Sequence, residues 1–198
     1  TAELKAAVVE AAKRDRGVEV TPDRVAVGCG AKHVLFNLAY ALYEPGDEVV
    51  IPAPYWVSYP EQVRMVGATP VIAPTRVEDG FRLSPEGLER VVTPKTKALI
   101  LCTPSNPTGA AYDAASLTRL LEVIRRGDYF VIVDEIYADL VYDGFEHCSL
   151  AKLAPDLGDR LIVVDGVSKS YAMTGWRIGW SITSPKLASA LATIQGQS

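Results

Sequence analysis

Short apolar runs alternate with helical patterns along most of this chain. Each run ends at a glycine, a proline or a polar residue, and the stretches between them carry apolar residues at helical spacing, as in 117–124. Parallel strands need a crossover between them, usually a helix, so the alternation predicts an α/β fold with a mostly parallel sheet. About seven strands are expected, slightly above the usual sheet size. No repeat or low-complexity linker divides the 198 residues, which predicts one domain.

Local signals place the individual elements. Ser84-Pro85 and Ser184-Pro185 pair a capping serine with a proline at the first helical position, so each predicts a helix start. Apolar residues at helical spacing predict a first helix that ends near Gly17: Leu4, Ala7, Val8, Ala11 and Ala12. Strands are predicted at 25–27, 48–51, 69–72, 98–101, 130–133, 161–164 and 177–183.

Charge and composition narrow the class of protein. A formal net charge of −4 gives no reason to expect a nucleic-acid or membrane partner. No apolar run approaches the roughly 18 residues of a membrane span, and no signal peptide is visible. The 3 cysteines are scattered, without metal-ligand spacing or a disulfide framework, so a cytoplasmic protein is expected.

Distinctive residues follow several of the predicted strands. In open α/β sheets, ligands bind outside the carboxyl ends of the strands, so these residues are candidates for one site. Each has an ordinary explanation when taken alone: a glycine-rich turn, a core aromatic, a turn or a helix cap. The candidates are Gly30-Ala31-Lys32, Trp56, Asn106, Asp134 and Tyr137.

Two cations stand near the end of the strand at 161–164. Lys169 lies just past that strand, and Arg177 follows at the start of the last one. A lone lysine is usually a solvated surface residue. A lysine and an arginine held together at a sheet edge, however, suit a ligand that carries an aldehyde and a phosphate. His33 and His147 have no evident partner, and we expect them on a helix surface and in a loop.

The segment around Lys169 resembles a known family. Its pattern, S-K-x-x-x-M-x-G-W-R-I-G over 168–179, is similar to the lysine segment of class I/II aminotransferases. These are fold type I enzymes that use pyridoxal 5'-phosphate (PLP), and bacterial aspartate aminotransferases are the nearest in pattern. The resemblance covers nearly all 198 residues. It implies a three-layer αβα sandwich and identifies 1–198 as a PLP-binding large domain, with an N-terminal arm and a C-terminal small domain missing.

The resemblance also implies a role for each candidate. Lys169 forms the Schiff base with PLP, Asp134 holds the ring nitrogen protonated, and Tyr137 contacts the ring oxygen. Trp56 stacks on the ring, and Asn106 reaches both the ring oxygen and the substrate carboxylate. The phosphate is held by Arg177 and the turn Gly30-Ala31-Lys32, with Ser168 as a further contact.

Two positions depart from the family pattern. Ala31 stands where a serine or threonine is frequent, so its contact would come from the backbone N–H alone. Gly166 stands where some members carry a serine or threonine that contacts phosphate, which leaves Ser168 as the substitute.

The activity implied is transamination, in which an aspartate-like amino acid passes its amino group to a 2-oxo acid. A PLP-dependent lyase of the same fold is one alternative, and it would keep Asp134, Tyr137 and Lys169. The second alternative is the aminotransferase-like sensor half of a transcription regulator. Small-molecule substrates and a homodimer are the expected partners. Since Thr1 and Ser198 both lie within helical patterns, the isolated chain is expected to be weakly active or inactive.

Overall fold

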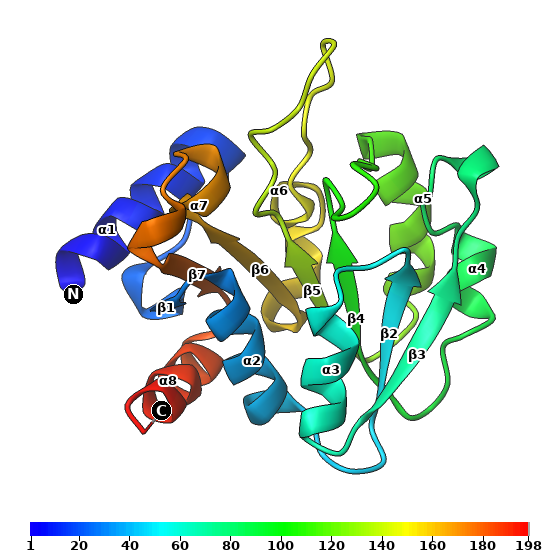
Figure 1. The fold of residues 1–198 in the computed structure, drawn as a ribbon, viewed down its shortest axis with the longest axis horizontal. Helices are drawn as coiled ribbons and strands as arrows, with labels where there is room; N and C mark the ends of the chain where they lie inside the picture. Colours follow the sequence, from blue (N-terminus) through cyan, green and yellow to red (C-terminus); the bar gives the residue numbers. More distant parts are fainter. Residues whose placement is uncertain (198) are drawn as a thin grey trace.

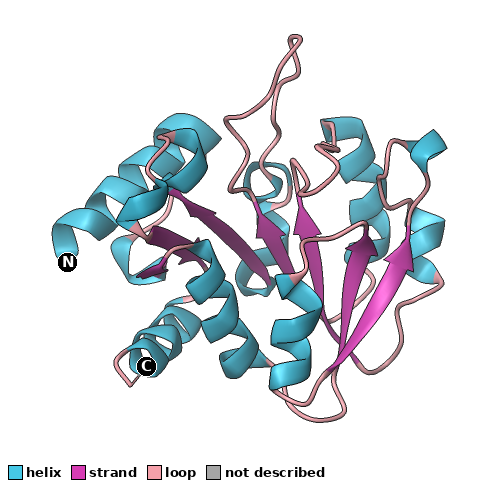
Figure 2. Ribbon diagram, viewed as in Figure 1, coloured by secondary structure: helices cyan, strands magenta, loops and turns pink. Residues whose placement is uncertain are grey.

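The computed structural model describes residues 1–197 and contains a seven-stranded sheet in the order β1-β7-β6-β5-β4-β2-β3. The sheet crosses the centre of the molecule with helices on either side (Figures 1 and 2). The strands are β1 (Val25–Cys29), β2 (Glu48–Ala53), β3 (Thr69–Pro74), β4 (Thr96–Cys102), β5 (Phe130–Asp134), β6 (Leu161–Gly166) and β7 (Ile178–Ile182).

Only β7 runs against its neighbours. It pairs antiparallel with both β1 and β6, whereas β6, β5, β4, β2 and β3 form parallel pairs. The expected mostly parallel sheet of seven strands is therefore confirmed. One consequence is local: the amino end of β7 lies at the edge where the other strands end, so the residue that precedes β7 belongs to that edge.

Two layers of helices cover the sheet and complete the expected αβα sandwich. On one face, α2 (Ala31–Leu42), α3 (Ser58–Met65) and α8 (Pro185–Gln195) bury their apolar sides in one core cluster. On the other face, α4 (Pro85–Glu89), α5 (Ala114–Ile124) and α6 (Leu150–Leu153) contribute to a second cluster. Ser84 and Ser184 cap α4 and α8 through their hydroxyl groups, as predicted.

Strand β4 shows why the sheet needs a helical layer on both sides. Ala98 and Ile100 belong to the first core cluster, whereas Leu99 and Leu101 belong to the second. Successive side chains of a strand point to opposite faces, so an apolar run buries both. This is why the strands of the interior are continuous apolar runs and do not alternate with polar residues.

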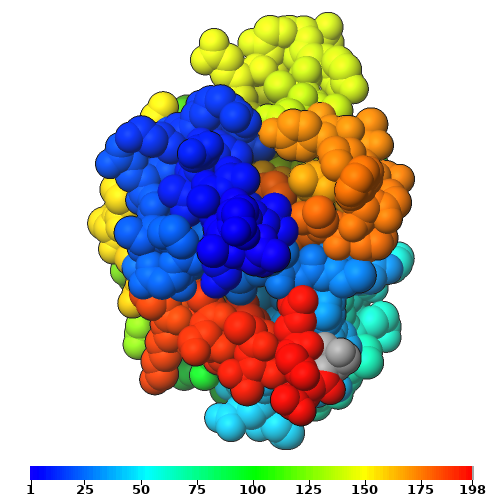
Figure 3. All heavy atoms as spheres, turned by 90° about the vertical axis from the view of Figure 1, so that its left-hand side faces the viewer, coloured from blue at the N-terminus to red at the C-terminus, as the bar shows by residue number. Residues whose placement is uncertain are grey.

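The first helix is less buried than its sequence predicted. Helix α1 (Ala2–Ala11) continues as a wider turn, η1 (Ala12–Arg16), and ends at Gly17 in the left-handed conformation with φ 65°. Of the predicted apolar face only Val8 and Ala12 are buried, and Ala7 is exposed. The reason is its position: α1 lies at the end of the sheet, where it packs on a small cluster containing Val25 and Trp180. Figure 3 shows this side of the molecule, with the N-terminal segment beside the chain that follows β6.

Between β5 and α6 the chain forms a long extension that projects from the sheet edge (Figure 1). Among residues 1–197, no helix combines the length and the apolar character needed to cross a membrane.

The first prediction concerns the two-sided core. Replacing Leu99 by alanine should lower the free energy of unfolding by about 2–5 kcal/mol, because Leu99 is fully buried and a cavity remains. Replacing Ile72 on the edge strand β3, where 36% of the residue is exposed, should cost clearly less. Urea unfolding measures both. Equal losses would contradict the assignment of the core.

Candidate active site

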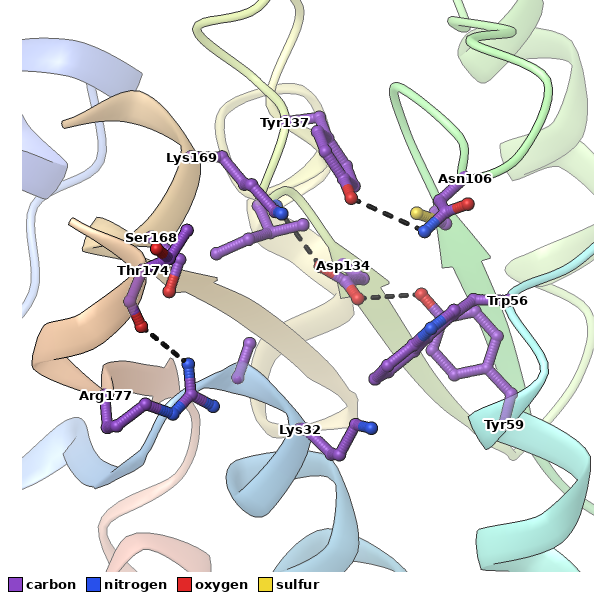
Figure 4. A pocket seen from close by; sticks show the side chains of 13 residues that line it. Lys32, Trp56, Tyr59, Asn106, Asp134, Tyr137, Ser168, Lys169, Thr174 and Arg177 are labelled. Carbon is purple, nitrogen blue, oxygen red and sulfur yellow. Dashed lines mark hydrogen bonds between the residues drawn. The ribbon is translucent and has the colours of Figure 1, made fainter. Parts of the chain in front are cut away.

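One cavity of about 280 Å³ lies at the edge where the parallel strands end. Every sequence-predicted site residue except Gly30 lines it, and Figure 4 shows how these side chains converge from separate elements. Its described lining consists of Ala31, Lys32, Trp56, Tyr59, Cys102, Asn106, Asp134, Ile136, Tyr137, Ser168, Lys169, Thr174 and Arg177.

Arg177 lies against the first residues of helix α2. It directly precedes β7 and adopts the left-handed conformation, with φ 53°. Its guanidinium donates hydrogen bonds to the carbonyl oxygens of Thr174 at 3.1 Å and Cys29 at 3.4 Å. Because N–H groups at the start of a helix carry partial positive charge, this corner of the pocket combines two sources that attract an anion.

Two glycines make that corner possible. Gly30 caps α2 with φ 80°, a conformation that disfavours side chains, and a Cβ there would collide with the guanidinium of Arg177. A Cβ on Gly179 would collide with the backbone of Gly30 and Ala31. Strand β7 and the start of α2 can therefore approach closely only because both positions lack a side chain.

Asp134 is a buried carboxylate at the end of β5. Its Oδ2 accepts a hydrogen bond of 2.7 Å from the Tyr59 hydroxyl, and its Oδ1 accepts one of 3.2 Å from the Ile136 N–H. Burial raises the pKa of Asp134 to about 6, because these two bonds offset only part of the desolvation of the charged form. Burial also raises the pKa of Tyr59 well above its ordinary value, so the phenol stays a donor.

Lys169, Tyr137 and Asn106 lie on the open side of the cavity. Lys169 projects from the short helix α7 (Val167–Ser170), and its Nζ lies 5.6 Å from the centre of the Tyr137 ring. The Asn106 amide donates to the Tyr137 hydroxyl over 3.4 Å. These residues come from three different connections after β4, β5 and β6, so their proximity depends on the order of the strands.

Trp56 forms part of the wall near α2. Its ring packs edge-on against Tyr59, with centroids 5.4 Å apart, and the Nζ of Lys32 lies 4.9 Å from its centroid. The described lining thus carries three cationic side chains, Lys32, Lys169 and Arg177, against one carboxylate, Asp134. Such a balance favours a ligand with more negative than positive charge.

Sequence reasoning missed several lining residues, above all Tyr59. Tyr59 stands three positions after Trp56 at the start of α3, which places both on one side of that helix. This spacing was the available signal, but a tyrosine at an apolar helix position also fits an ordinary core residue. Cys102, whose thiol pKa burial raises to about 12, is the other buried addition. Ile136 and Thr174 complete the set.

Two further expectations gain a physical explanation or a correction. At Gly166 a Cβ would lie 2.8 Å from the Ile178 carbonyl oxygen, so the pairing of β6 with β7 leaves no room for a serine or threonine there. His147 does lie in a loop, but its side chain is only 7% exposed and Nε2 is 3.5 Å from Glu135 Oε2. His33 accepts a hydrogen bond from the Cys29 N–H, although its sequence position indicated a plain surface residue.

Comparisons with known proteins agree with this architecture. The sequence profile of the family "Aminotransferase class I and II" matches residues 1–198. The aspartate/prephenate aminotransferase of Cereibacter sphaeroides is 48% identical over 197 residues, covering 99% of this chain and 49% of the relative. The aspartate aminotransferase of Bacillus subtilis is 43% identical, covering 100% of this chain and 50% of its own length.

Solved structures show the same fold. The aspartate aminotransferase of Rhizobium meliloti superposes with a TM-score of 0.96 at 45% identity, over 99% of this chain and 49% of the other. That of Thermus thermophilus, solved with maleate, gives a TM-score of 0.94 at 43% identity over 100% and 50%. The chain spans about half the length of the relatives it matches. Its match along the whole of its own length shows that it belongs to the class I and II aminotransferase family.

Proposed function

We propose that residues 1–198 form the cofactor-binding large domain of a PLP-dependent aminotransferase that transfers the amino group of an aspartate-like amino acid to a 2-oxo acid. Enzymes of this family depend on PLP. The observation that carries the proposal is the convergence of Lys169, buried Asp134 and Arg177 in one cavity. A lysine to bond an aldehyde, a carboxylate for a ring nitrogen and an arginine for a phosphate match the three ends of the cofactor.

Asp134 fits the ring nitrogen of PLP. A buried carboxylate is costly unless a cation or enough donors compensate it, and Asp134 keeps a raised pKa even with its two hydrogen bonds. A protonated pyridine nitrogen would supply the missing positive charge. Asp134 would in turn keep that nitrogen protonated, with the Tyr59 hydroxyl holding the orientation of the carboxylate.

The corner at Arg177 fits the phosphate. Its guanidinium and the first N–H groups of α2 offer charge and donors, and the missing side chains of Gly30 and Gly179 keep the approach open. Ala31 contributes only its backbone there. Lys32 and Ser168, which also line the cavity, add a charge and a hydroxyl donor.

PLP, when bound, supplies an aldehyde that captures the substrate amine and a ring that accepts the electron pair of the Cα–H bond. The chain's own residues do the rest. Lys169 holds the cofactor, is released when substrate takes its place, and its Nζ then moves the proton from the substrate Cα. Tyr137 and Asn106, already hydrogen-bonded to each other, are placed to donate to the ring oxygen. Trp56 covers the ring, and Asn106 also contacts the substrate carboxylate.

Relatives indicate the substrate class. The names of two of them include aspartate and prephenate, and a third was solved with maleate, so these proteins handle acids with two carboxylates. The cationic excess of this pocket supports the same class for this protein. The named relatives are aminotransferases, and neither a lyase nor a transcription regulator finds support among them. A cytoplasmic homodimer, usual for the family, is proposed as the assembly.

The proposal predicts amino transfer by the full-length protein from aspartate to 2-oxoglutarate, measured as glutamate formation. The Asp134→Asn variant should lose at least about 100-fold in kcat while retaining some cofactor, because the protonated ring nitrogen acts mainly in the transition state. Asp159→Asn, whose side chain is 68% exposed, serves as the control and should keep its activity. Ammonia release without glutamate would identify a lyase, and an unimpaired Asp134→Asn variant would remove Asp134 from the mechanism.

A pH prediction follows from the raised pKa of Asp134. In the cofactor-free protein the folded state holds this proton up to about pH 6, whereas the unfolded chain releases it near 3.8. Between these values the folded state binds more protons, so its stability falls as pH rises. The whole effect is about 3 kcal/mol, at about 1.4 kcal/mol for each unit of pKa.

Urea unfolding of wild type and Asp134→Asn at pH 4 and pH 7 isolates this group from other carboxylates, including buried Asp165. Relative to the variant, wild type should lose stability over this range. A constant difference between the two proteins would show that Asp134 has an ordinary pKa.

A further inference from the structure

Behind the cavity, one arginine faces three carboxylates from other parts of the chain. Arg16 ends the N-terminal helical segment, at the last residue of η1. Its Nη1 lies 2.8 Å from Asp139 Oδ1, its Nη2 lies 3.2 Å from Asp165 Oδ2, and its Nε lies 3.8 Å from Glu135 Oε2. None of these residues lines the cavity described above.

The cluster is largely withdrawn from solvent. The side chains of Arg16 and Asp165 are each 11% exposed, and that of Glu135 is fully buried. Backbone groups hold the outer oxygens: the Leu150 N–H donates to Glu135 Oε1 and the Gly166 N–H to Asp165 Oδ1. Such a cluster is expensive to desolvate, and apolar residues in its place would often stabilise a fold equally well.

The three carboxylates share a relation to the pocket. Glu135 directly follows Asp134, and Asp139 lies shortly after Tyr137. Asp165 stands near the end of β6, just before the helix that carries Lys169. Each segment that presents a pocket residue on one side therefore presents a carboxylate to Arg16 on the other.

We propose that Arg16 is a positioning residue, which holds the segments bearing Asp134, Tyr137 and Lys169 at fixed separations from behind the pocket. For its catalytic consequence, the inference rests on the proposed function. The planar guanidinium suits this task, because its Nε, Nη1 and Nη2 point toward three different partners at once. A lysine ammonium has no such fixed fork. Small displacements of reacting groups can cost up to about 100-fold in rate, so loss of the fork should appear in kcat.

The competing explanation is that Arg16 only anchors the N-terminal helix to the sheet. Anchoring alone predicts a lower global stability and unchanged local order in the pocket segments. Positioning predicts local loosening of both 134–139 and 165–170, which the pocket residues occupy. Hydrogen exchange separates the two, because local openings and global unfolding are read at different amides.

The test compares Arg16→Met, Arg16→Lys and the control Arg24→Met in the full-length protein. Arg24 belongs to the same N-terminal region and makes one ion pair of 2.7 Å with exposed Asp159. In cofactor-free protein, Arg16→Met should speed exchange in both segments by about tenfold, whereas Arg24→Met should stay within about twofold. In the loaded enzyme, Arg16→Met should lower kcat about tenfold or more, with KM for the amino donor within about threefold. Arg16→Lys should recover part of both effects.

If Arg16→Met fails to fold, Asp139→Asn replaces it, because the Asp139 side chain is 42% exposed and its neutralisation leaves less charge buried. It should show smaller changes in the same direction. Unchanged exchange in both segments, or unchanged kcat, would overturn the inference. Faster exchange in a wild-type background that transfers no amino group would instead refute the proposed function, and would still support Arg16 as the residue that orders these segments.

Discussion

The parallel arrangement of strands is the constraint on which the site depends. Because β1, β2, β4, β5 and β6 end at one edge, the residues that follow them are brought together without any contact in the sequence. Strand β7 adds the one residue that parallel strands could not. Running in the opposite direction, it begins at that edge and delivers Arg177 there, while Gly30 and Gly179 allow the close approach to α2.

Unequal burial then gives the pocket its polarity. Asp134 lies deep at the end of β5, where desolvation raises its pKa, and Arg177 lies at the helix start, where backbone dipoles already favour an anion. A ligand that is cationic at a ring nitrogen and anionic at a phosphate satisfies both places at once. The ion cluster around Arg16 repeats the same logic one layer behind, since it ties together the segments whose front sides form the pocket.

Much of this arrangement could be predicted from sequence, because it follows from patterns that are local. The apolar runs located all seven strands, and the capping serines located two helix starts. Pattern resemblance then identified nearly every lining residue. What could not be predicted depends on contacts between distant elements. The hydrogen bond from Tyr59 to Asp134, the buried pairing of His147 with Glu135 and the fork of Arg16 all join residues far apart in the chain. The shallow burial of α1 likewise reflects its place at the end of the sheet.

The central claim is that Lys169 is the amine that bonds the cofactor, and one measurement tests it directly. Borohydride reduction of the PLP-loaded full-length protein makes the bond between cofactor and lysine permanent, and peptide mapping then locates it. The account predicts a pyridoxyl group on the peptide that contains Lys169, with none on the Lys169→Ala variant. A pyridoxyl group on Lys32 or Lys186, or labelling that survives in the Lys169→Ala variant, would contradict it.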